Sequence, residues 1–142
     1  MRFWDSSAVV PLCIDAPNAP AIRALLRADE AMAVWWATHT ECVSALARQV
    51  RDRALDVRGE RQARAVLAAL SRAWAEVQPS QAVRTSAERL LRRHPLRAAD
   101  AFQLASALQW CGGRPDSEEF VSFDERLRAS AEREGFAVFP AT

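Results

Sequence analysis

Short apolar segments alternate with longer amphipathic segments along almost the whole of this chain. The short segments are typical of buried β-strands, and the longer ones carry apolar residues at helical spacing. Strands that alternate with helices favour a parallel sheet, because each helix returns the chain to the end of the sheet where the previous strand began. The sequence therefore predicts an α/β fold, a three-layer α/β/α arrangement around a central, mainly parallel sheet of roughly five strands.

We expect strands at residues 2–5, 31–36, 76–78, 119–123 and 136–139. Helices are expected at 6–13, 21–28, from 38 or 40 onward, beyond Gly59, and at 81–94, 98–110 and 124–134. Gly59 is expected to separate two long helices, and Leu91 to lie on the buried stripe of the helix at 81–94. No repeat or linker interrupts the pattern, so residues 1–142 are expected to form one domain.

The composition indicates the cellular compartment expected for this chain. Half of the 142 residues are hydrophobic, yet charges interrupt every long apolar run, so no membrane span is expected. Asp5 leaves no room for the apolar core of a signal peptide. Three widely spaced cysteines indicate reduced thiols and a cytoplasmic protein rather than a disulfide framework.

The basic residues exclude some chemistry. All 19 are arginines, so any mechanism that needs an active-site lysine is ruled out. Receiver-type signalling domains and haloacid-dehalogenase-type phosphatases both use such a lysine, and the chain resembles them poorly. His39 and His94 lie in no metalloprotease motif, which argues against a zinc hydrolase.

Four acidic residues lie where strands should give way to helices, namely Asp5, Glu41, Asp100 and Asp124. Each has an ordinary explanation as a helix cap or first-turn residue, and Asp100 with Gln103 would also fit a capping box. Caps, however, have no reason to converge on one crevice. Carboxylates that meet at the strand ends of an open α/β sheet repel one another, and a divalent metal relieves that repulsion. The pattern favours a metal-dependent phosphodiester hydrolase.

The segments around these acids resemble a known family. They are DSSAVV at 5–10, TECVSAL at 40–46, LRAADAFQLA at 96–105 and VSFDERL at 121–127. Together they are similar to the four acidic motifs of PIN-domain ribonucleases, and most closely to VapC-type toxins of bacterial toxin–antitoxin pairs. The resemblance covers essentially the whole chain, in the right order.

The resemblance implies a PIN-like fold and an Mg²⁺- or Mn²⁺-dependent endoribonuclease. Asp5, Glu41, Asp100 and Asp124 would be the catalytic, metal-binding acids, with Ser6 and Ser122 orienting ligands or waters. It also implies an RNA substrate, a VapB-like antitoxin and a homodimer, with Leu25, Leu26, Trp35 or Trp36 on the contact surface. The alternative is a catalytically silent α/β domain that binds a protein partner through its acidic pocket.

Two groups of basic residues are candidates for RNA contact, although each also fits a solvated helix face. The first is Arg84, Arg89, Arg92, Arg93, His94 and Arg97, and the second is Arg48, Arg51, Arg53, Arg58, Arg61 and Arg64. Trp35 and Trp36 are more often core or interface residues than platforms for stacking bases.

Overall fold

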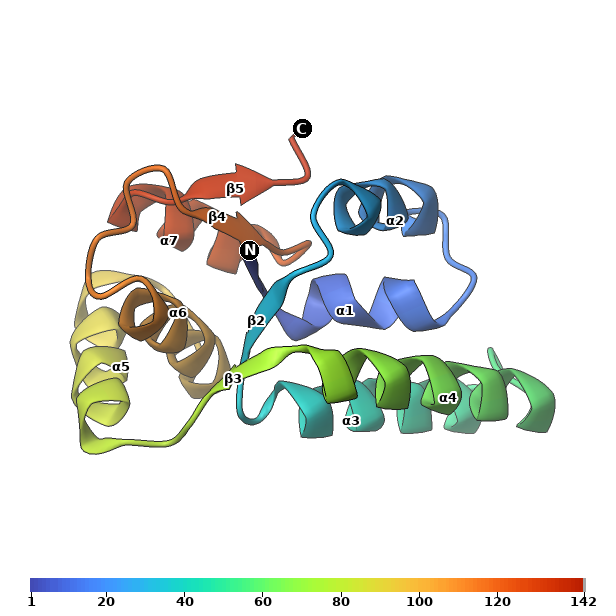
Figure 1. Cartoon of the computed structure of the whole chain (residues 1–142). Helices are drawn as coiled ribbons and strands as arrows, with labels where there is room; N and C mark the ends of the chain where they lie inside the picture. The colour runs from blue at the N-terminus through green and yellow to red at the C-terminus, as the bar shows by residue number, and fades with distance from the viewer. Residues whose placement is uncertain (142) are drawn as a thin grey trace.

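The computed structural model describes residues 1–141 and shows a parallel five-stranded sheet between two layers of helices (Figure 1). The strand order is β3-β2-β1-β4-β5, and every neighbouring pair is parallel. This confirms the predicted three-layer α/β/α fold. The strands are β1 (Arg2–Trp4), β2 (Met32–Trp35), β3 (Ala75–Val77), β4 (Glu119–Val121) and β5 (Ala137–Phe139).

The first four helices cover one face of the sheet and the last three cover the other, as Figure 1 shows. The first layer is α1 (Ser6–Cys13), α2 (Ala19–Ala28), α3 (Thr38–Arg51) and α4 (Val57–Ala73). The second layer is α5 (Gln81–Arg93), α6 (Ala98–Trp110) and α7 (Glu125–Glu134). No helix within residues 1–141 is both long and apolar enough to cross a membrane.

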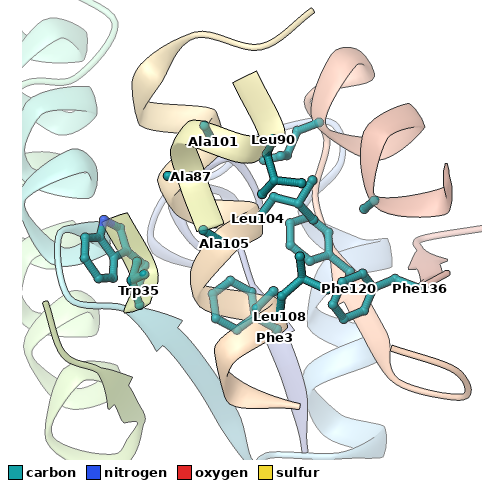
Figure 2. Packing of buried hydrophobic residues seen from close by; sticks show 14 of the residues in the cluster. Phe3, Trp35, Ala87, Leu90, Ala101, Leu104, Ala105, Leu108, Phe120 and Phe136 are labelled. Atoms are coloured by element: carbon teal, nitrogen blue, oxygen red, sulfur yellow. The ribbon is translucent and has the colours of Figure 1, made fainter. Parts of the chain in front are cut away.

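Alternation along the strands divides the core into two halves. Phe3 and Phe120 point toward α5, α6 and α7, whereas Trp4 and Val121 point toward the α1–α4 layer. Successive strand residues face opposite sides of a sheet, so each strand supplies both halves. Figure 2 shows the first half, where Phe3, Phe120 and Phe136 pack together and Trp35 lies at the far end. Because both faces are buried, the strands read as continuous apolar runs rather than as alternating ones.

Two expectations from the helical pattern are wrong. Gly59 does not separate α3 from α4 but lies in the first turn of α4, where its N–H donates to the capping carboxylate of Asp56 at 2.7 Å. The break lies at residues 52–56 instead. Leu91 is 40% exposed, because the buried stripe of α5 is Val83, Ala87 and Leu90. Helical spacing cannot distinguish the last residue of a buried stripe from the first residue beyond it.

The strand order reverses beside β1, and this creates the crevice for a site. From β1 the chain builds β2 and β3 on one side, and it then returns to place β4 and β5 on the other. In open parallel sheets such a reversal leaves a crevice at the carboxyl ends of the two central strands. The backbone N–H of Asp5 donates to the carbonyl of Val121 at 3.0 Å, so the ends of β1 and β4 are joined at this point.

Candidate active site

Asp5 lies at the base of this crevice, directly after β1. It occupies the N-cap position of α1, yet its side chain makes no capping hydrogen bond. The side chain of Asp5 accepts instead from the hydroxyls of Ser7 and Ser122, the latter at 2.9 Å. Ser6, which was expected to orient ligands, is more distant, at 3.4 Å from the same carboxylate. Only 4% of Asp5 is exposed, so its orientation is fixed by these neighbours.

The two serine hydroxyls are themselves held by backbone groups. Ser7 Oγ accepts from the N–H of Phe123 at 2.9 Å, and Ser122 Oγ accepts from the N–H of Asp124 at 3.0 Å. Because each oxygen accepts from an N–H, its own hydrogen is free to point at Asp5. Ser122 was expected to act in this way, whereas the part of Ser7 was missed. Its position two residues after Asp5, in the first turn of α1, is the only signal the sequence gives.

Asp100 and Asp124 line one cavity at the same edge of the sheet. Asp124 is the N-cap of α7, where its Oδ1 accepts from the N–H of Leu127 at 2.9 Å. Asp100 lies in the first turn of α6. The cavity measures about 650 Å³, and its other charged lining residues are Arg97, Glu125 and Arg126. Asp124 is therefore a helix cap as the ordinary explanation had it, and its side chain also lines the cavity at the crevice.

Glu41 is held from the opposite layer by Gln103. The amide nitrogen of Gln103 donates to Glu41 Oε1 at 2.5 Å and to Thr38 Oγ1 at 2.9 Å. The alternative of a capping box formed by Asp100 and Gln103 does not apply, since Gln103 reaches across to α3 while Arg97 is the N-cap of α6. Gln103 is 1% exposed, and its carbonyl oxygen has no partner among the described residues. The sequence signal for this role of Gln103 is its position three residues after Asp100 in the same helix.

The charges of neighbouring acids raise the pKa of three of the four predicted site residues, namely Asp5, Glu41 and Asp100. Burial raises the pKa of Glu41 to about 6, and the charges of Asp5 and Asp100 add to that effect. Burial also raises the pKa of Asp5 and of Asp100, and in both cases the charge of Asp124 raises it further. Each acid therefore couples to at least two of the others. The tertiary structure thus brings the four predicted site residues to one edge of the sheet.

Only some of the candidate arginines reach this edge. Arg97 and Arg126 line the Asp100 cavity, and Arg48 lines a cavity of about 410 Å³ beside Glu41. Arg126 belonged to neither basic group of the sequence. Arg93 and His94 instead contact Glu134, at 3.6 and 2.7 Å.

Comparison with known proteins places this arrangement in a family. The PIN-domain family matches residues 2–133. The chain belongs to the PIN-domain family. The PIN domain recognised from the four acidic motifs is thereby confirmed. A search of curated proteins finds no match to the chain.

One solved structure similar to this PIN domain is that of VapC20 from Mycobacterium tuberculosis, described as a toxin that cleaves the sarcin–ricin loop. The two chains are 18% identical, with 96% of this chain and 97% of the other covered at a TM-score of 0.70. At this identity the likeness shows the fold.

The donor atoms of this PIN domain suit a hard divalent cation. All four acids offer oxygen ligands, and among residues 1–141 none of them forms a salt bridge within 4.0 Å. In the same part of the chain, no three His, Cys, Asp or Glu side chains are grouped to enclose an ion. Mg²⁺ does not need such a cage, because it takes one or two carboxylates and completes its shell with water and phosphate oxygens.

Proposed function

We propose that this PIN domain is an Mg²⁺- or Mn²⁺-dependent endoribonuclease and the toxic component of a VapBC-type toxin–antitoxin pair. The observation that carries the proposal is the gathering of the four acids at the strand reversal. Asp5 directly follows β1, and Asp100 and Asp124 line one cavity. Glu41 accepts from Gln103, which lies one turn beyond Asp100 in α6. A folded protein has no structural need for four carboxylates whose charges gather at one edge of a sheet. A cation that binds there offsets their repulsion.

In this proposal the four acids hold the cation, with Asp5 in a fixed orientation. When bound, the ion supplies positive charge that polarises the scissile phosphate and acidifies the attacking water. Glu41 Oε1 accepts from Gln103, which fixes the orientation of this carboxylate. Arg97 and Arg126 line the cavity, where their planar guanidinium groups suit the phosphates of the RNA.

A nuclease assay tests this function. The full chain is incubated with single-stranded and loop-containing RNA, with Mn²⁺ or with excess EDTA. We expect cleavage only with metal, and its loss in Asp5→Asn and Asp100→Asn, which remove a charge with little change of volume. Asp116→Asn is the matched control, because Asp116 is exposed in the loop before β4, at the opposite edge of the sheet. Cleavage in EDTA would contradict the metal mechanism. Absence of cleavage under all conditions would favour the silent partner-binding domain.

The antitoxin is proposed to occupy an apolar groove and to block the acidic pocket, with an arginine inserted among the carboxylates. A groove of about 380 Å³ lies between α2 and α4. Its lining is mostly apolar but includes two charged residues, and it consists of Leu26, Arg27, Glu30, Met32, Val66, Ala69, Leu70, Ala73 and Trp74. Leu26 was expected on such a surface. Trp35 was also expected there, but it is only 7% exposed and belongs to the core.

Co-expression with the protein encoded by a small neighbouring reading frame tests the pairing. Relief of toxicity and a stable complex on size exclusion are expected for the wild-type chain. Val66→Asp should prevent the complex, because it places a charge in the groove on a residue already 38% exposed. Val57→Asp is the control, since Val57 is exposed outside the groove. Equal complex formation by both variants would argue against the groove.

A further inference from the structure

We propose that a pocket at the carboxyl ends of β2 and β3 binds an unpaired nucleobase of the RNA strand whose phosphate lies at the acidic site. This inference rests on the proposed ribonuclease function and names a further part of its substrate site. The pocket measures about 360 Å³, within the range of roughly 300–1,000 Å³ usual for ligand sites. It is lined by Trp35, Trp36, Ser80, Gln81, Arg84 and Phe102, together with a proline.

Aromatic rings form a rigid wall in this pocket. The rings of Trp35 and Phe102 are parallel, with an angle of 0° and centroids 5.5 Å apart. Trp36 stands at 72° to Trp35, with centroids 6.4 Å apart, and is 53% exposed. Its backbone N–H donates to the carbonyl of Val77 at 3.0 Å, so the residue is fixed to the end of β3. An ordered, half-exposed indole is the kind of surface on which unpaired bases stack.

The polar side of the pocket suits an RNA strand. Arg84 is its only charged residue, and the guanidinium donates to Gln81 Oε1 at 3.2 Å, which holds it near the start of α5. No acidic side chain lines the pocket, in contrast to the cavities of Asp100 and Glu41. Arginine provides a contact for phosphate or for a base edge, and the hydroxyl and amide groups of Ser80 and Gln81 are within the same lining.

The position of the pocket connects it to the acidic site. Trp36 directly precedes Ala37, which lines the cavity of Glu41. Phe102 directly precedes Gln103, which donates to Glu41. Since all five strands are parallel, their carboxyl ends form one continuous edge. A single strand that lies along this edge passes from the Asp100 cavity beyond Glu41 to the end of β2, where one of its bases meets Trp36.

Binding without catalysis tests the inference separately from the proposed function. Fluorescein-labelled single-stranded RNAs of mixed sequence are titrated with the full chain in EDTA, and binding is followed by fluorescence anisotropy. Trp36→Ala should weaken binding about 5- to 150-fold, the range for loss of one stacked base, whereas Trp36→Phe should retain most of the affinity. Leu91→Ala is the matched control, because it truncates another exposed apolar residue, 40% exposed, outside the pocket.

Two further measurements identify the contact. In a series of RNAs that each lack one base, the RNA that lacks the stacked base should bind the wild-type chain weakly. Trp36→Ala should not weaken the binding of that RNA further, because the base that stacks on Trp36 is already absent. Arg84→Gln should reduce the slope of log affinity against log salt by about 0.7, the value for one phosphate contact on a single strand. Trp36→Ala should leave that slope unchanged.

The outcomes separate the possible occupants. Trp36→Ala that binds every RNA within twofold of wild type would overturn the inference. The inference would also be overturned if sedimentation shows a wild-type dimer that Trp36→Ala dissociates without a change in RNA affinity. The pocket would then be an interface between two copies of the chain. Should Trp36→Ala lose its native circular dichroism, Trp36→Leu keeps apolar cover without an aromatic ring and gives the same decision. Cleavage with Mn²⁺ is measured in parallel, so RNA binding without cleavage counts against the nuclease alone.

Discussion

Removal of the Gln103 amide should change the ionisation of Glu41 without unfolding the protein. Gln103→Leu keeps a buried side chain of similar size but loses the donor to Glu41 Oε1 and Thr38 Oγ1. This hydrogen bond lowers the pKa of Glu41, which burial otherwise raises. Without it, the folded-state pKa of Glu41 should rise above its present value of about 6.

The size of the change follows from the two protonation states. A hydrogen bond to a charged group contributes about 1.5–3 kcal/mol, and one to a neutral group about 0.5–1.5 kcal/mol. The difference is about 1–1.5 kcal/mol, which corresponds to about one pH unit. The partial exposure of Glu41 makes this an upper value. The pKa of Glu41 in Gln103→Leu should therefore lie at most near 7.

The effect on stability at low pH should be small, because two changes oppose each other. The variant leaves the buried Thr38 hydroxyl without its donor, which costs about 1–3 kcal/mol. It also removes the carbonyl oxygen of Gln103, which has no partner among the described residues and carries a cost of the same order. The variant also loses the hydrogen bond to Glu41, which is neutral at pH 4 and for which that bond contributes about 0.5–1.5 kcal/mol. We therefore expect the free energy of unfolding at pH 4 to fall by about 0.5–1.5 kcal/mol.

The pH dependence gives the decisive measurement. Folded Glu41 binds protons more tightly than the unfolded residue, so its contribution is fully present below pH 4.5 and is lost as the pH rises through about 6. In Gln103→Leu that loss should extend to about pH 7. Carboxyl NMR in EDTA, with Glu41→Gln to assign the signal, follows the titration directly. Gln109→Leu is the control, since it makes the same change on the exposed side of α6. A pKa for Glu41 that stays at about 6 in Gln103→Leu would refute the reasoning.

Two further predictions concern stability. Asp100→Asn should raise the melting temperature in EDTA at neutral pH, because it removes the repulsion between the carboxylates of Asp100 and Asp124. It should also reduce the rise in melting temperature caused by Mn²⁺. For wild type, Mn²⁺ at a hundredfold excess over Kd should increase the free energy of unfolding by about 2.7 kcal/mol. Equal melting of both proteins with and without metal would show that the acids do not form one site. Arg128→Gln should destabilise the fold by roughly 2 kcal/mol, because Arg128 donates to the carbonyls of Ser122 and Pro140 at 2.7 Å each, joining the loop after β4 to the chain beyond β5. Urea unfolding checks this with exposed Arg133→Gln as the control, and equal loss in both would exclude a specific role for the two carbonyl contacts.

Most of the fold could be predicted because its signals are local. The strand at β1 and the helix α6 agree with the sequence to within a residue, since buried strands and apolar helices have distinct periods. The errors fall where the signal is weak or shared. Gly59 favours a break by propensity, but Asp56 caps the helix ahead of it and so includes the glycine in α4. Trp35 and Trp36 are adjacent and chemically alike, yet one is buried and the other is exposed.

The contacts between acids and their partners could not be predicted in the same way. Gln103 lies 62 residues from Glu41, and Ser122 lies 117 residues from Asp5. In the sequence alone, Gln103 is an ordinary polar residue of a helix and Ser122 an ordinary polar residue at the end of a strand. The function of each in the site depends on the element that packs opposite, and a single sequence contains no direct record of that packing.

The sequence by itself determined the order of strands and helices, the absence of any catalytic lysine, and the four acids at their junctions. Those properties follow from residue type and spacing along the chain. The tertiary structure alone decided that Gln103 faces Glu41, that Ser7 and Ser122 fix Asp5, and that Trp36 stands exposed beside the acidic edge. The physical reason is that hydrogen bonds, burial and charge coupling act over a few ångströms in space. Only the folding of the sheet brings residues distant in sequence within that range.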